Sequence, residues 1–289
     1  MIGIISYLPN DKELRTTRIK NCKKQLEWLH KVFPKERPLV IAQNYTDIDK
    51  CTNFDVEYDL YETGIGSHKA RNTILRKFYD SENSWLFLMD DDVINYDYYD
   101  ADTFIADVYY NKYPTLSTDI ILAMQPEMSP FKKLNLENDV KHTYYLSRSA
   151  ATNCPNMMLL KHPDKEHEHY FDDSIDLLAD DAIPDDNKFI VECIASGMKV
   201  HRADFWIKKS LDRDVSVIYS RQKDINYAQH SNLGKNLANF VKTTYDVDSV
   251  AEFNKRYNKA VPIRLKRSVV YEIPDNLLPK DSVKKNRLF

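Results

Sequence analysis

The chain has 289 residues, of which 43% are hydrophobic and 29% are charged, and its formal net charge is −3. This size and balance are typical of a globular protein with a large core, and no apolar run approaches the roughly 20 residues that span a bilayer. Four cysteines without a CxxC pair argue against a thiolate zinc site and fit a reducing compartment. We therefore expect a soluble, cytoplasmic protein.

Charge is unevenly distributed along the chain. Residues 201–289 contain 18 Lys and Arg against 10 Asp and Glu, a balance of +8, whereas residues 1–200 have a balance of −11. A basic C-terminal third favours an anionic partner such as nucleic acid or phosphate, although exposed lysines also serve as an ordinary solubilising surface.

Strand and helix patterns alternate through the first two thirds of the chain. Apolar patterns predict strands at 1–8, 38–47, 54–62, 84–92, 118–126 and 156–162, and helical spacing predicts helices at 16–33, 68–80, 100–113, 187–200 and 232–245. This rhythm predicts an α/β fold with a mixed, mostly parallel sheet that is flanked by helices.

Three adjacent aspartates end the apolar run at 85–89. In a strand, Asp90 and Asp92 would face one side of the sheet and Asp91 the other, but just past the end of a strand this geometry loosens. Ligands of such sheets bind at the carboxyl ends of the strands. Two carboxylates can share one Mg2+ or Mn2+ and leave sites for substrate phosphates. The alternative is a solvated acidic turn.

A glycine-containing turn precedes this strand. Gly64 and Gly66 stand where a strand pattern gives way to a helix, so that backbone amides can approach an anion, and Ser67 is expected to cap the helix. Arg71 and Asn72 follow about one turn inside the helix, and an arginine suits phosphate as a forked donor. Any tight turn would also use such glycines.

Together these segments resemble the nucleotide-sugar glycosyltransferases of the GT-A fold, most closely their large inverting family. The resemblance covers about residues 1–205 and is carried by Gly66, Ser67, Ala70, Arg71, Asn72 and Asp90–Asp92. A second segment resembles the family's Glu-Asp motif with its helix and glycine, but Asp185 replaces the glutamate before Asp186. We expect a catalytic domain at 1–205 and, at 206–289, a basic, largely helical extension that packs on it and helps to bind the acceptor.

The resemblance implies roles for individual residues. Aspartates of the family's D-x-D motif bind Mn2+ or Mg2+ at the diphosphate of the donor, which is expected to be a UDP-sugar. The implied metal ligands are Asp90, Asp92 and His230, and the implied donor contacts are Tyr7, Pro9, Asp47, Gly66, Arg71, Asn72, Asp90 and Asp91. An inverting reaction also needs a carboxylate base, for which Asp186 is the first candidate and Asp185 and Asp181 are the reserves.

The sequence leaves the acceptor open. Basic clusters at 264–268 and 284–287 are of the kind that neutralises phosphates, and a composition rich in Asn, Lys, Asp and Tyr is typical of proteins of large tailed phages. One hypothesis is therefore transfer of glucose or arabinose to a hydroxymethylated cytosine of duplex DNA, flipped out of the stack, in the host cytoplasm. A polysaccharide or lipopolysaccharide acceptor is the rival. A metal-dependent nuclease or phosphoryl-transfer enzyme, or a non-catalytic binding module, stays open as another class.

Overall fold

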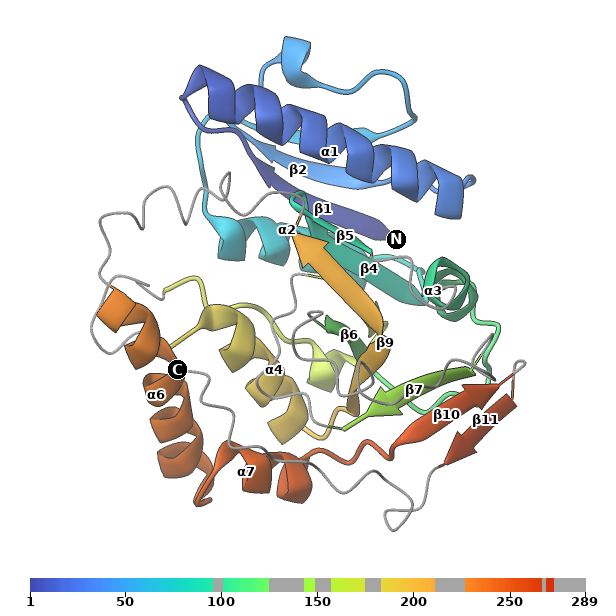
Figure 1. Ribbon diagram of the computed structural model, residues 1–289, viewed down its shortest axis with the longest axis vertical. Helices are drawn as coiled ribbons and strands as arrows, with labels where there is room; N and C mark the ends of the chain where they lie inside the picture. Colours follow the sequence, from blue (N-terminus) through green and yellow to red (C-terminus); the bar gives the residue numbers. More distant parts are fainter. Residues whose placement is uncertain are drawn as a thin grey trace.

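The computed structural model of the protein describes residues 1–95, 101–124, 143–148, 157–174, 183–210, 227–266 and 269–272. Its strands are β1 (Ile2–Tyr7), β2 (Leu39–Gln43), β3 (Glu57–Tyr61), β4 (Trp85–Asp90), β5 (Val93–Asn95), β6 (Ile120–Met124), β7 (Thr143–Ser147), β8 (Met157–Lys161), β9 (Val200–Ser210), β10 (Ile263–Lys266) and β11 (Val269–Glu272). Its helices are α1 (Lys12–Val32), α2 (Ser67–Tyr79), α3 (Ala101–Tyr109), α4 (Asp185–Ala195), α6 (Tyr227–Tyr245) and α7 (Val250–Tyr257), and 3-10 turns lie at Asp47–Asp49 and Lys165–His167 (Figure 1).

The strands form one mixed sheet in the order β11-β10-β7-β9-β6-β8-β4-β1-β2-β3, and β5 pairs with β9. The four strands β3, β2, β1 and β4 run parallel, because the crossovers through α1, through residues 44–56 and through α2 each return the chain to the same end of the sheet. Beyond β4 the pairs β4–β8 and β8–β6 are antiparallel, and β6–β9 is parallel again. The expected mixed α/β sheet flanked by helices is confirmed.

Alternate residues of the central strands build a core on each face of the sheet. Ile4, Phe87 and Met89 belong to the core beneath α1 and α3. Leu86 and Leu88 belong to the core beneath α2, α4, α6 and α7. Both faces of β4 are buried, which is why this strand is a continuous apolar run in the sequence. Consecutive residues at the end of β4 therefore face opposite helical layers.

Local sequence signals set the helix ends. Asp11 caps α1, because its carboxylate accepts hydrogen bonds from the amides of Glu13 at 3.0 Å and Leu14 at 2.9 Å. The cap of α2 is Gly66, at φ 88°, and not Ser67 as expected; Ser67 is the first helical residue. Gly197, at φ 100°, follows the end of α4, so that this helix stops before the predicted residue 200.

Residues after 205 complete the same layers. β9 continues from Val200 to Ser210 across that position, and β10 pairs with β7. The helices α6 and α7 pack beside α4, which Figure 1 shows on the side of the sheet away from α1. Within the described ranges, no helix is both long enough and apolar enough to cross a membrane.

Candidate active site

The carboxyl ends of β1 and β4 lie side by side, because Ile5 is in register with Asp90. Arg71, on the second turn of α2, reaches this edge of the sheet. Its Nη2 donates to both carboxylate oxygens of Asp90, at 3.0 and 3.1 Å, and its Nη1 donates to Asp186 in the first turn of α4. One guanidinium thus joins the two acidic motifs that are far apart in the sequence.

Aromatic rings support this guanidinium. Arg71 lies over the ring of Phe171 at 5.2 Å, and Phe171 stacks on Phe189 with ring centroids 4.2 Å apart. Asn72 holds the backbone of Phe171 with two hydrogen bonds of 2.8 Å, one in each direction. Asn72 was expected to contact the donor, but its side chain is buried and is used on this backbone, so it supports the platform beneath Arg71.

Exposure separates the five aspartates of the two motifs. The side chains of Asp90, Asp92 and Asp186 are 20%, 20% and 19% exposed. Those of Asp91 and Asp185 are only 1% and 8% exposed. The first three can therefore meet a ligand that arrives from solvent, whereas the other two are buried.

Asp91 faces the layer of α1, as strand alternation requires. Arg18 of α1 donates to its carboxylate through Nη2, and the hydroxyl of Ser6 donates to the other oxygen. Burial raises the pKa of Asp91 to about 7, and the positive charge of Arg18 opposes this shift. The carboxylate of Asp91 therefore points into the core and not toward solvent, which the expected contact with the donor would require.

Asp90 and Asp92 do not share a face. Asp90 belongs to the layer of Arg71, and burial raises its pKa to about 6 although Arg71 opposes the shift. Backbone pairing with β1 continues through the amide of Asp91, which donates to the carbonyl oxygen of Ile5 at 3.2 Å. Asp92 follows in the turn, where alternation ends, and its carboxylate accepts a hydrogen bond from Arg18 Nη1 at 3.2 Å. The same-face orientation that continued strand alternation would give Asp90 and Asp92 is therefore not found, because β4 ends at Asp90.

The first turn of α4 carries two unlike carboxylates. Burial, with the negative charge of Asp186 beside it, raises the pKa of Asp185 to about 8. His68 Nε2 lies 2.8 Å from Asp185 Oδ2, in contact but without hydrogen-bond geometry. Burial lowers the pKa of His68, and the charge of Arg71 acts in the same direction. Asp181, the remaining expected base, lies outside the described residues.

The opposite side of this edge is formed by the end of β1 and the turn before α2. Tyr7 ends β1, Pro9 is buried just beyond it, and a side chain at Gly64 would place its Cβ 2.9 Å from the Tyr7 ring. Any larger residue at 64 would therefore force the Tyr7 ring to shift. The amide of Gly66, expected to face an anion, instead donates to Gln43 Oε1 at 3.1 Å, as the amide of Ile65 does at 2.8 Å.

Asp47 is placed on the protein surface. Its side chain is 92% exposed and pairs with Lys50 at 2.7 Å, and the hydrogen bond from Lys50 lowers its pKa. Its neighbour Asp49 is the residue that turns inward, where it pairs with Arg15 of α1. The donor contact expected at Asp47 stays a prediction.

A divalent metal ion is the group that the resemblance implies at this edge. Carboxylate oxygens of Asp90 and Asp92 are ligands of the type that Mg2+ and Mn2+ prefer, and both side chains reach solvent. In the described part of the chain, however, no three His, Cys, Asp or Glu side chains form a metal-binding group. His230 lies in α6, but its side chain is not among those described. The donor atoms fit in kind, and the third ligand stays a prediction.

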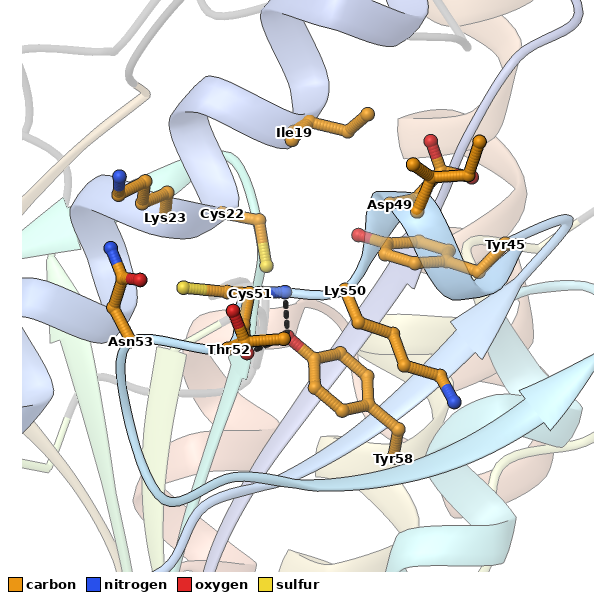
Figure 2. A pocket seen from close by; sticks show the side chains of 11 residues that line it. Ile19, Cys22, Lys23, Tyr45, Asp49, Lys50, Cys51, Thr52, Asn53 and Tyr58 are labelled. Carbon is orange, nitrogen blue, oxygen red and sulfur yellow. Dashed lines mark hydrogen bonds between the residues drawn. The ribbon is translucent and has the colours of Figure 1, made fainter.

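A separate cavity of about 160 Å3 lies between α1 and the segment after β2 (Figure 2). It is lined by Ile19, Cys22, Lys23, Tyr45, Ile48, Asp49, Lys50, Cys51, Thr52, Asn53 and Tyr58. Tyr45 connects it to the acidic motif: its hydroxyl lies 2.6 Å from that of Ser6, and Ser6 donates to Asp91. Ser6 has a single hydrogen, so Tyr45 is the donor in the first bond.

The sequence did not predict three residues of this site: Arg18, His68 and Phe171. Arg18 had a usable signal, since helical spacing places it on the same face as Cys22 and Leu29, which are buried. A charged side chain on a buried face requires a partner of opposite charge. His68 and Phe171 had no such signal, because their contacts join residues distant in the sequence.

Two comparisons found no match: no protein-family model and no curated protein matches the chain. Among solved structures, the chain is similar to residues 1–349 of S. aureus TarS, with a TM-score of 0.51 and 14% identity over 85% of this chain and 73% of that chain. The same region of TarS in complex with UDP-GlcNAc gives a TM-score of 0.51 and 15% identity over 83% and 72%. A longer TarS structure is covered over 43% of its length. At this identity the similarity shows a shared fold.

Proposed function

We propose that the protein is a glycosyltransferase that moves a sugar from a nucleoside-diphosphate sugar, with a UDP-sugar favoured, to an acceptor hydroxyl. The observation that carries this proposal is the position of Arg71, which holds Asp90 and Asp186 together at the carboxyl edge of the parallel strands. This edge is where ligands of open α/β sheets bind. The fold shared with TarS, whose structure was solved with UDP-GlcNAc, supports the same class of donor.

The residues of the edge divide the work on the donor. Tyr7 and Pro9 at the end of β1 form the side that takes the nucleotide base, next to the close approach of Gly64. Arg71 is the cation that stabilises charge on the departing diphosphate, since its guanidinium is held rigidly by Phe171 beneath it. A Mn2+ or Mg2+ ion held by Asp90 and Asp92, with His230 as a further ligand, would supply Lewis-acid stabilisation of the same charge.

Asp186 is assigned as the base that removes the proton of the acceptor hydroxyl. A general base must be deprotonated at the working pH and must reach the substrate. Asp185 meets these requirements less well, because burial raises its pKa and its side chain is only 8% exposed. Asp186 is more exposed and lies beside Arg71, close to the leaving group. Asp181 remains the reserve.

The proposed acceptor follows from the positive charge of the C-terminal part of the chain. We propose that residues 206–289 bind the acceptor and that a hydroxymethylated cytosine of duplex DNA is the acceptor to test first. The transfer assay should include glucose and arabinose donors, and a polysaccharide or lipopolysaccharide should be assayed as the alternative acceptor. Transfer to DNA predicts salt-sensitive binding, because phosphate contacts release counterions. If the protein shows no detectable binding at low salt to either modified or unmodified DNA, the DNA acceptor is ruled out.

The donor reaction is tested with nucleotides. UDP, GDP, CDP and ADP, each with MnCl2, are added at about 100 times their dissociation constant, where a bound ligand stabilises the fold by roughly 2.7 kcal/mol. We expect one nucleotide to raise the melting temperature and the matching nucleotide sugar to be consumed. Asp186→Asn should keep the thermal shift and lower turnover by about 100-fold or more, whereas Asp185→Asn is the matched control and should keep both. Absence of any nucleotide shift or diphosphate release would refute the proposed function.

A further inference from the structure

One face of α1 carries polar side chains into the core. Arg18 and Gln25 are seven residues apart, two turns of helix, and are 8% and 0% exposed. Apolar residues of the same face, such as Leu29, pack in the core beneath the sheet. Burial of the Gln25 amide and the Arg18 guanidinium is costly unless both groups form hydrogen bonds. The groups to which they bond therefore indicate why the buried face of α1 carries polar side chains.

Gln25 holds the backbone on both sides of the aspartate turn. Its Nε2 donates one hydrogen to the carbonyl oxygen of Asp90 and the other to that of Val93. These two carbonyls flank Asp91 and Asp92, so a single amide group closes the turn that follows β4. No charge is involved, and the contact fixes the path of the backbone.

Arg18 holds the side chains of the same turn. Its Nη2 donates to Asp91 and its Nη1 to Asp92, so the two arms of one guanidinium set the positions of two adjacent carboxylates. A planar fork can do this, whereas an ammonium group is a single point of charge. From the opposite side Ser6, backed by Tyr45, holds Asp91.

We propose that Arg18 and Gln25 are positioning residues of the donor site, which fix the turn 90–93 so that Asp90 and Asp92 meet the donor's diphosphate in one defined geometry. This inference rests on the proposed function of that turn. Neither residue touches the donor; each acts through the turn. A misplacement of about 1 Å at such a site can cost roughly 100-fold in rate, so their removal should affect donor binding and turnover more than folding.

Two substitutions separate geometry from charge. Gln25→Met keeps the length and volume of the side chain, changes no charge, and removes both bonds to the backbone of the turn. Arg18→Lys keeps the positive charge beside Asp91 but cannot hold Asp92 at the same time. Arg15→Met is the matched control, since Arg15 stands on the same helix and loses a comparable ion pair, to Asp49, and a bond to Asn44, away from the turn.

The readouts are baseline melting temperature, the added thermal shift from UDP with MnCl2, and kcat/KM for UDP-GlcNAc or the UDP-sugar that the wild type consumes. We expect all three variants to melt at a lower temperature than the wild type. Only Gln25→Met and Arg18→Lys should lose most of the UDP shift and drop at least 10-fold in kcat/KM, while Arg15→Met stays within about twofold of the wild type.

Each outcome decides the inference. If both Gln25→Met and Arg18→Lys keep the UDP shift and kcat/KM of the wild type, the two residues are structural only and the inference is wrong. If Arg15→Met falls as far as they do, the effect is general destabilisation and the inference is also wrong. Should Arg18→Lys fail to fold, Gln25→Met carries the test alone. An inactive wild type that binds no nucleotide would instead remove the proposed function.

Discussion

His201, in β9, is buried as a neutral imidazole, and this predicts how the stability of the protein depends on pH. The side chain is 0% exposed; its Nδ1 lies 2.8 Å from the Thr118 hydroxyl and its Nε2 2.9 Å from the carbonyl oxygen of Val261. Nε2 must donate to that carbonyl, which leaves Nδ1 of the neutral ring as an acceptor. Thr118 has one hydroxyl hydrogen, and it serves Nδ1 when it turns away from the more distant carbonyl oxygens of Ile120 at 3.1 Å and Lys199 at 3.4 Å. The bond from His201 Nε2 to Val261 ties β9 to the segment before β10. Burial lowers the pKa of His201 to about 4, although the nearby charge of Asp119 opposes the shift.

The sign and size follow from the two pKa values. Between its unfolded pKa of 6.5 and its folded pKa of about 4, His201 binds a proton only in the unfolded chain. Its contribution is therefore fully present above about pH 6.5 and is lost as the pH falls. From pH 7.5 to pH 5.0 the expected loss is about 2 kcal/mol of unfolding free energy. Buried carboxyls with a raised pKa stabilise the fold as the pH falls, which is the opposite effect. The contribution of His201 to the unfolding free energy must therefore be isolated with a variant.

Urea unfolding of the wild type and of His201→Gln, at pH 7.5 and at pH 5.0, isolates the contribution of His201. Glutamine can still donate to Val261 but does not titrate, so the stability difference between the two proteins should shrink by about 2 kcal/mol on going to pH 5.0. His30→Gln, at an exposed position of α1, is the matched control and should show no such change. An equal difference at both pH values would refute a buried neutral His201.

Three further predictions concern the turn at Gly66, the aromatic ring of Phe171 beneath Arg71, and the divalent metal ion. Gly66→Ala should lower the unfolding free energy by about 1 to 3 kcal/mol in urea, purely from backbone strain at φ 88°, because no atom lies within 4 Å of the added Cβ; an unchanged urea midpoint would contradict this. Phe171→Ala should lower the unfolding free energy by about 3 to 5 kcal/mol, because Phe189 loses its stacking partner. It should also lower kcat, because Arg71 loses the ring that supports it. An unaltered kcat would show that turnover does not need this support. A chelator should abolish the UDP-induced thermal shift and MnCl2 should restore it, whereas a shift that persists in chelator would remove the metal from the donor site.

Patterns of short range in the sequence predicted the parallel half of the sheet. The apolar runs that became β1, β2 and β4 and the amphipathic pattern of α2 are local, because burial on two faces or on one face leaves a periodic trace. The pairing of β7, β9 and β10 left no such trace, since each strand finds its partner across a long stretch of chain. The boundary of the first helix was also missed, because the cap at Asp11 precedes the apolar spacing by several residues.

The sequence by itself determined which residue types gather at the carboxyl edge: the aspartates after β4, the arginine of α2 and the acidic start of α4. Only the tertiary structure decided which aspartate does what. Alternation along β4 turns Asp90 toward Arg71 and Asp91 toward Arg18, and the end of the strand frees Asp92 to follow Arg18. Burial then raises the pKa of Asp185 but leaves Asp186 within reach of solvent. Such differences arise from the layers packed on each face, which no local pattern records.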